Sequence, residues 1–217
     1  MTANKPFIIA IDGPAASGKG TLARRLAEHY NFALLDTGAL YRAVGWNVIR
    51  AGGDPENESD ALKGTKILSE VNLNNPELRT EPIGAAASKV ASMPAVRRTL
   101  VDFQRHFAHN PPTDKDGTIL DGRDIGTVIC PDAQVKIFIT AEVETRAKRR
   151  FIEEYSEDGT AKEYSRILED LKVRDERDMN RAASPLKKAE NAHLINTTNS
   201  DIEAVFEAAV KFVSSKM

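Results

Sequence analysis

The stretch FIIAIDGPAASGKGT, residues 7–21, decides the fold of this chain. It opens with an apolar run, residues 7–11, that is mostly β-branched and therefore predicts a short buried strand. Residues 13–19 follow with the spacing Gly, four residues, Gly, Lys, and a helical pattern continues over residues 18–29. A glycine-rich turn between a buried strand and a helix is the context in which this motif binds nucleotide phosphates.

The chemistry of phosphate binding explains the residue types in this loop. Glycine lets backbone N–H groups approach phosphate oxygens closely, and the positive end of the following helix dipole favours the same anion. We therefore predict that phosphates are bound by Gly13, Pro14, Ala15, Ala16, Ser17, Gly18, Lys19, Gly20 and Thr21. The hydroxyl that could hold Mg²⁺ comes one position later than usual, at Thr21. The alternative interpretation is a plain turn with a surface lysine.

The rest of the chain alternates short apolar runs with helical patterns. Further strands are predicted at residues 33–35, 119–120, 135–139 and 193–196. Helices are predicted at residues 83–92 and 95–108 and in the last segment, where Ser200 and Glu203 fit a capping box. Strands that alternate with helices predict an α/β fold with a parallel sheet of about five strands and helices on both faces.

We expect a single domain with two additions to its core. The predicted core comprises about residues 5–50, 110–142 and 182–217. Residues 51–109 begin with a polar segment rich in glycine, proline and asparagine, and they are predicted to form an insertion that covers the edge of the sheet. Residues 143–181 are predicted to form a lid, in which two charged helices are joined by the polar loop 156–163.

Composition limits the classes of function. Of 217 residues, 41% are hydrophobic and 29% charged, which is typical of a globular protein. The 30 basic and 32 acidic residues give a net charge of −2, whereas nucleic-acid binding normally needs a basic excess. We expect no nucleic-acid or membrane partner. The lone Cys130 excludes an intramolecular disulfide and fits a cytoplasmic location. The sequence has no coiled-coil pattern that would indicate obligate assembly, so we expect a monomer.

Acidic and basic residues gather after the third predicted strand. The block Asp121-Gly122-Arg123-Asp124 follows its carboxyl end, where ligands bind in open α/β sheets. An aspartate there can hold Mg²⁺ directly or through water, and an arginine can clamp a phosphate with two hydrogen bonds. The alternative is a turn with a local ion pair.

Two predicted helices each carry three arginines at helical spacing. One set is Arg146, Arg149 and Arg150, and the other is Arg174, Arg177 and Arg181. Such faces are usually solvated surfaces. Arginine nevertheless suits two-pronged phosphate contacts, and two arginine helices joined by a polar loop can close over a nucleotide to exclude water.

Four blocks of this sequence resemble the bacterial cytidylate kinase family. They are residues 13–21, 34–42, 121–128 and 174–181, and they occur in the family's order over nearly the whole chain. The resemblance implies a P-loop kinase that transfers the γ-phosphoryl group of ATP to CMP or dCMP, with Mg²⁺. One departure is that the segment 55–82 is short and lacks strand alternation, whereas family members often carry a longer insertion there.

The resemblance also implies roles for individual residues. ATP would be bound by the phosphate loop and by the lid arginines Arg146, Arg149 and Arg150. Contacts to the acceptor nucleotide would come from Thr37, Tyr41, Arg42, Ser88, Arg97, Asp121, Arg123, Asp124, Arg174, Asp178 and Arg181, with residues 51–109 as the acceptor-binding insertion. The catalytic residues would be Lys19, Arg123, Asp124 and Arg181. Magnesium would be held through water by Thr21 or Asp121.

Two other functions remain open at the level of the sequence. The first is a P-loop kinase for another small acceptor, such as AMP, UMP or a metabolite hydroxyl. The second is a nucleotide-dependent switch, against which the chain lacks the Asn-Lys-x-Asp stretch that reads guanine.

Overall fold

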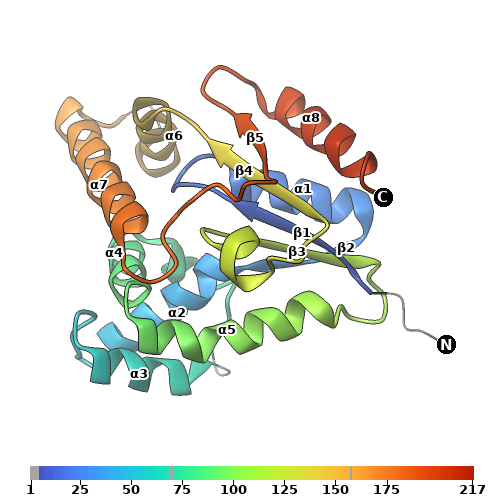
Figure 1. The fold of residues 1–217 in the computed structure, drawn as a ribbon. Coiled ribbons are helices and arrows are strands. Elements are labelled where there is room, and N and C mark those ends of the chain that lie inside the picture. Colours follow the sequence, from blue (N-terminus) through green and yellow to red (C-terminus); the bar gives the residue numbers. More distant parts are fainter. Residues whose placement is uncertain (1–4, 69–70, 157) are drawn as a thin grey trace.

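A computed structural model of the chain describes residues 5–68, 71–156 and 158–217 (Figure 1). These residues form a five-stranded sheet in the order β2-β3-β1-β4-β5, and all of its strand pairs are parallel. The strands are β1 (Phe7–Asp12), β2 (Phe32–Asp36), β3 (Gly117–Gly122), β4 (Val135–Thr140) and β5 (His193–Asn196). The predicted α/β fold with a parallel sheet is confirmed, although β3 is longer than the predicted strand 119–120.

Helices cover both faces of the sheet (Figure 1). One face carries α1 (Lys19–Tyr30) and α8 (Ile202–Ser214), and the other carries α2 (Thr37–Arg50), α4 (Glu81–Val90) and α5 (Pro94–His109). Side chains alternate along a strand. Ile9 and Ile11 of β1 therefore pack in the apolar core beneath α1 and α8, whereas Ile8 and Ala10 pack in the core beneath α2, α4 and α5. None of the helices formed by the described residues is long and apolar enough to cross a membrane.

The predicted insertion covers a face of the sheet, so the expectation that it covers the edge was wrong. Its helix α5 lies over β3, an inner strand, and Thr118 of β3 donates a hydrogen bond to the carbonyl oxygen of Ala108 at 2.8 Å. The polar segment contains a helix that the sequence analysis missed, α3 (Glu58–Lys66), and a short 3-10 turn, η2 (Pro76–Arg79). The side chain of Asn57 caps α3 by accepting hydrogen bonds from the N–H groups of Ser59 and Asp60.

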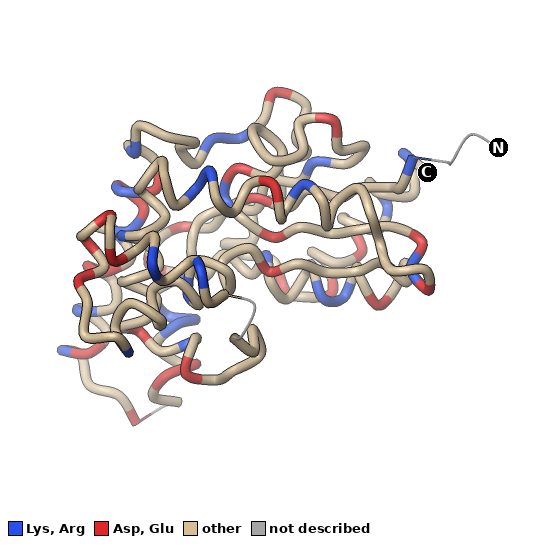
Figure 2. Tube along the Cα trace, turned by 90° about the horizontal axis from the view of Figure 1, so that it is seen from below, with Lys and Arg blue, Asp and Glu red and all other residues tan. Residues whose placement is uncertain are grey.

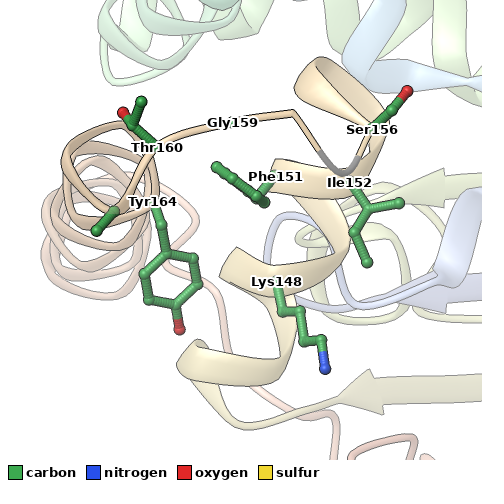
Figure 3. Close-up of a pocket in the computed structure, with 8 residues that line it drawn as sticks. Lys148, Phe151, Ile152, Ser156, Gly159, Thr160 and Tyr164 are labelled. Carbon is green, nitrogen blue, oxygen red and sulfur yellow. The ribbon is translucent and has the colours of Figure 1, made fainter.

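The predicted lid region contains two helices, α6 (Val143–Tyr155) and α7 (Ala161–Asn180). These helices pack through a small apolar cluster that includes Ala147 and Leu171. Phe151 also lies beside a hollow of about 500 Å³ near the start of α7 (Figure 3). The polar loop was predicted to reach residue 163, but α7 begins at Ala161 because Thr160 caps it. Position 157 of that predicted loop lies outside the described residues.

Two local features differ from the expected pattern. The cap of α8 is Asp201, whose side chain accepts a hydrogen bond from the N–H of Ala204 at 2.8 Å. The capping box of Ser200 and Glu203 was therefore wrong, because Ser200 lies one residue outside the cap and Glu203 pairs with Arg25 at 2.8 Å. After β3 the chain forms a single π-helical turn, η3 (Ile125–Ile129), which no periodicity in the sequence indicated.

Charged residues of both signs are interspersed along the tube in Figure 2. The lone thiol, Cys130, is buried. Burial raises the pKa of this thiol to about 12, so it stays protonated and behaves as a small apolar side chain.

Candidate active site

The phosphate loop joins the carboxyl end of β1 to the start of α1. A Cβ at Gly13 would lie 2.1 Å from the carbonyl oxygen of Ile139, so only glycine fits there. Gly18 caps α1 with φ of 91°, a left-handed conformation that glycine adopts without strain. Lys19 turns back over the loop and donates a hydrogen bond to the carbonyl oxygen of Pro14 at 3.3 Å. The predicted strand, loop and helix context is thus present.

A cleft of about 460 Å³ opens from this loop between the sheet and the helices α4 and α7. The predicted site residues that line it are Ala15, Ala16, Ser17, Gly18, Lys19, Gly20, Thr21, Thr37, Tyr41, Arg42, Ser88, Arg97, Asp121, Arg123, Asp124, Arg150, Arg174, Asp178 and Arg181. Four predicted site residues do not line it, namely Gly13, Pro14, Arg146 and Arg149. Segments far apart in sequence therefore meet at the carboxyl ends of the parallel strands.

The cleft gathers more positive charge than its acids neutralise at close range. Burial and the neighbouring Arg123 lower the pKa of Arg174 to about 10, and burial followed by the same neighbour lowers the pKa of Lys19 to about 8. The pKa values of Arg42 and Arg181 are also lowered, mainly by burial. Cations that disfavour one another in this way make a site for an anion, because a bound phosphate relieves their repulsion.

Aspartates hold several of these cations in place. Asp178 accepts a hydrogen bond from Nε of Arg123 at 3.0 Å. Burial acts to raise the pKa of Asp178, but Arg123, Arg174 and other arginines outweigh it and the pKa is lowered. Asp36, which the sequence analysis did not select, lies 3.6 Å from the guanidinium of Arg42. These carboxylates fix the directions in which the guanidinium groups can act.

A second group of polar side chains forms one corner of the cleft, which we call the base corner: Tyr41, Ser88, Arg97, Asp124 and Arg177. Arg97 forms a buried ion pair with Asp124, and its guanidinium lies 5.5 Å from the ring centroid of Tyr41. Arg177 donates a hydrogen bond to Oγ of Ser88 at 3.0 Å. Nε of Arg97 and the hydroxyl of Tyr41 are buried and make no hydrogen bond within the described residues. Fixed polar groups with unused hydrogen-bonding capacity suit a flat polar ligand.

Comparison with known proteins identifies the family. The family model described as Cytidylate kinase matches residues 9–215. The chain belongs to the cytidylate kinase family. A cytidylate kinase of Brucella suis biovar 1 (strain 1330) is 54% identical over 208 residues, covering 96% of this chain and 93% of that protein. One of Paramagnetospirillum magneticum is 53% identical over 209 residues, covering 96% of this chain and 98% of that protein.

These matches confirm the resemblance and the predicted enzyme class, a phosphotransferase. A crystal structure of an uncharacterized protein from Eubacterium ventriosum has a TM-score of 0.57 at 18% identity and covers 96% of this chain and 99% of that chain. This likeness shows the fold alone.

Two of the three arginines of α6 lie outside the cleft. Arg146 donates hydrogen bonds to the carbonyl oxygens of Ala141 at 2.9 Å and Ala15 at 3.2 Å, and it pairs with Asp175 at 2.5 Å. Arg149 donates to the carbonyl oxygen of Thr197 at 2.6 Å, and the Thr197 hydroxyl in turn donates to the carbonyl of the loop residue Ser17. Both arginines support the phosphate loop from outside the cleft.

Other predicted residues are likewise engaged within the protein. Arg150 lines the cleft and pairs with Glu154 at 2.6 Å. The hydroxyl of Thr37 donates a hydrogen bond to the carbonyl oxygen of Asp121 at 2.7 Å, and so joins the ends of β2 and β3. Arg181, expected on the same helix face as Arg174, lies just beyond the last residue of α7.

The cleft has one carboxylate suited to a magnesium ion. Within residues 5–68, 71–156 and 158–217 no three or more His, Cys, Asp or Glu side chains cluster as metal ligands. Mg²⁺ in kinases needs only one or two carboxylates, since waters and phosphates complete its octahedron. Oδ1 of Asp121 is buried without a hydrogen bond, and its nearest cation is Lys19 at 3.9 Å. Asp121 therefore fits the metal, directly or through water.

The predicted site residues did not include Asp36 or Arg177, both of which line the cleft. A signal existed for each. Asp36 ends a strand at the edge where ligands bind, and Arg177 shares a helix face with Arg174. Spacing could not reveal that Arg177 reaches Ser88, since the two residues are far apart in the chain.

Proposed function

We propose that this protein transfers the γ-phosphoryl group of ATP to CMP or dCMP, giving CDP or dCDP. The observation that carries the proposal is the cleft, which runs from the phosphate loop past a cluster of arginines to the base corner. Family membership supports the same function and does not favour the alternatives, another small acceptor or a nucleotide-dependent switch.

On the donor side, the phosphate loop and Lys19 bind the triphosphate of ATP. Burial lowers the pKa of Lys19 to about 8, so the amine is mostly protonated at neutral pH, and a bound phosphate favours that charge further. Asp121 would hold Mg²⁺, which would supply positive charge against the phosphates of the donor. Arg150 extends from α6 into the cleft and reaches the donor from the lid.

On the acceptor side, the arginines bind the monophosphate and the sugar. Arg42, Arg123 and Arg181 bind the acceptor phosphate, and Arg174 and Asp178 contact the ribose. In the transition state the charge on the transferred group is spread over its equatorial oxygens, so positioned cations contribute most of the catalysis. No strong general base is required.

The base corner distinguishes cytosine from uracil. The carboxylate of Asp124 accepts a hydrogen bond from the amino group of cytosine, and Arg97 and Ser88 bind its other polar edge atoms. Uracil presents a carbonyl where cytosine has the amino group, so a carboxylate oxygen would face an acceptor and remain unpaired. A buried polar group left unpaired in this way gives strong discrimination.

The test is the release of ADP from ATP and magnesium with CMP, dCMP, UMP, AMP or no acceptor. We expect CMP and dCMP to be phosphorylated fastest and ATP hydrolysis without an acceptor to be slow. Equal or faster turnover of AMP would contradict the cytidine assignment. Rapid hydrolysis that no monophosphate stimulates would instead identify a switch.

We also propose that the enzyme acts as a monomer in the cytoplasm. Cys130 is buried and stays protonated, so it remains a free thiol. A free thiol is typical of proteins in the reducing cytoplasm, which supports this location. Light scattering after size exclusion tests the oligomeric state and should give a mass close to 23.8 kDa.

A further inference from the structure

We propose that Asp12 is a positioning residue that holds the acceptor loop, residues 123–126, in register with the phosphate loop. Asp12 is the last residue of β1 and directly precedes Gly13, where the phosphate loop begins. Its side chain is only 4% exposed and does not line the cleft. It therefore acts on substrate only through other residues, and the proposal rests on the function proposed above.

Both oxygens of Asp12 are bound to the acceptor loop. Oδ1 accepts a hydrogen bond from the backbone N–H of Ile125 at 2.8 Å, and Oδ2 accepts one from the N–H of Gly126 at 2.8 Å. These two residues directly follow Arg123 and Asp124, which we assign to the acceptor phosphate and base. The carboxylate thus fixes the backbone on which both side chains are mounted.

The π-helical turn explains why this loop needs an outside partner. The N–H groups at the start of any helix have no acceptor within it. The residue before η3, Asp124, makes no capping hydrogen bond with its side chain, which is committed to Arg97 instead. Asp12 supplies the missing acceptors from a strand that lies 113 residues away in sequence. A π-helical turn is rare and occurs mostly at functional sites, which agrees with a role in placing these residues.

Asp12 connects the phosphate loop to the acceptor loop, and these two loops are held with different rigidity. The phosphate-loop end is held by the backbone itself, because Gly13 packs against the carbonyl of Ile139 with no room for a side chain. The acceptor-loop end depends on the two hydrogen bonds to Asp12. A defect at Asp12 should therefore displace Arg123 and Asp124 more than the ATP loop.

Near neutral pH the protonated and ionised forms of Asp12 are present in similar amounts. Burial raises its pKa to about 7, the hydrogen bonds from Gly126 and Ile125 lower it, and the charges of Asp124 and Asp121 raise it. Other titratable groups near this turn are Lys136 on β4, against whose side chain Gly126 packs, and Cys130 after η3. Arg105 of α5 also faces the turn and donates hydrogen bonds to the carbonyl oxygens of Val128 and Ile129. Above pH 7 the carboxylate form, which accepts both hydrogen bonds best, predominates.

The test compares Asp12→Asn with the wild type and with Asp132→Asn, a control at an exposed carboxylate that pairs with Lys5. The amide places a donor against one of the two backbone N–H groups, so that buried N–H loses its acceptor. At pH 8 we expect KM for CMP to rise about tenfold while KM for ATP changes less than twofold. We expect the control to match the wild type. Equal changes in both KM values, or none, would overturn the proposal.

Stability provides a readout that separates positioning from a merely structural role. A raised native pKa means that the folded state binds a proton more readily than the unfolded chain, so the Asp12 contribution to stability falls as pH rises from about 4 to 7. The melting temperature of Asp12→Asn should therefore improve relative to wild type between pH 5 and pH 8, while its KM for CMP stays high. If KM of Asp12→Asn for CMP returned to the wild-type value at the pH where its melting temperature does, the positioning role would be refuted.

A measurement on the wild-type enzyme covers the case in which Asp12→Asn does not fold. Hydrogen exchange at the amides of Ile125 and Gly126 should slow when CMP binds and should not change with a non-hydrolysable ATP analogue alone. Exchange that slows with the ATP analogue but not with CMP would overturn the proposal. If neither substrate binds the wild-type protein, the function proposed above fails first.

Discussion

The helices α6 and α7 both carry arginines at helical spacing but use them differently. Arg146 and Arg149 of α6 bind backbone carbonyls of the phosphate loop and its neighbour Thr197. Arg174 and Arg177 of α7 line the cleft, and Nε of Arg174 has no hydrogen bond within the described residues. Helical spacing places charges on one face, but only the tertiary structure decides whether that face meets backbone or ligand.

This difference separates a structural role of α6 from a ligand-binding role of α7. Arg146 and Arg149 of α6 satisfy carbonyl oxygens and a buried aspartate, so removing them should weaken the fold first. Arg174 has neighbours that repel it, so removing it should weaken substrate binding and leave the fold intact. Four substitutions test the comparison.

The largest effect is expected at Arg174. We expect Arg174→Ala to lower kcat/KM for CMP by about 10²–10³, as when a preorganised donor is removed from an active site. Its melting temperature should equal or exceed that of wild type, because repulsion with Arg123 is lost. The exposed Lys172→Ala on the same helix is the control and should retain activity. A collapse in melting temperature with full activity in the folded fraction would show that Arg174 is structural.

The second effect is expected at Arg146 and concerns stability. The pair with Asp175 is buried, with side-chain exposures of 5% and 12%, so Arg146→Ala leaves a carboxylate without its partner. We expect a loss of about 3–5 kcal/mol in the free energy of unfolding, measured with urea. The double variant Arg146→Met with Asp175→Leu should recover much of that loss. Unchanged stability with a raised KM for ATP would place Arg146 on the donor instead.

A smaller effect of the same kind is expected at Arg149. Arg149→Ala removes two hydrogen bonds to Thr197, and each contributes about 0.5–1.5 kcal/mol. Because Thr197 also contacts the carbonyl of Ser17, KM for ATP should rise more than KM for CMP. Thermal unfolding and steady-state kinetics measure both quantities. An effect on CMP alone would break the assignment of Arg149 to the donor side.

The smallest change in stability is expected at Arg150. Its side chain is 31% exposed and its partners are Glu153 and Glu154, so Arg150→Ala should cost less than about 1 kcal/mol. Arg150 is the one member of its set that lines the cleft, so KM for ATP should still rise. If that KM is unchanged, none of the α6 arginines contacts the donor, and the contrast between the two helices becomes complete.

The sequence predicted the sheet and the phosphate loop well because both depend on local signals. An uninterrupted β-branched run predicts a buried strand, and the glycine spacing before Lys19 predicts the loop. The parallel pairing followed from the alternation of strands and helices, whereas the strand order β2-β3-β1-β4-β5 came from the structure. The missed helix α3 begins in a segment rich in turn residues, and its cap, Asn57, was read only as part of a loop.

Features that depend on distant contacts were not predictable. The π-helical turn at 125–129 depends on Asp12, and the use of Arg146 depends on Asp175 and on a carbonyl of the phosphate loop. Spacing on one helix contains no information about such partners. The candidate site was therefore found as a set of residues, while the division between those that bind ligand and those that hold the fold came from the structure.

A crystal structure of the enzyme with CMP and a non-hydrolysable ATP analogue tests the central claim most directly. We predict that CMP lies among Arg123, Arg174 and Arg181 with its base against Asp124, while Arg146 keeps its hydrogen bond to the carbonyl of Ala15. A structure in which Arg146 leaves that carbonyl to bind a nucleotide, or in which CMP lies outside the arginine cluster, would contradict the account.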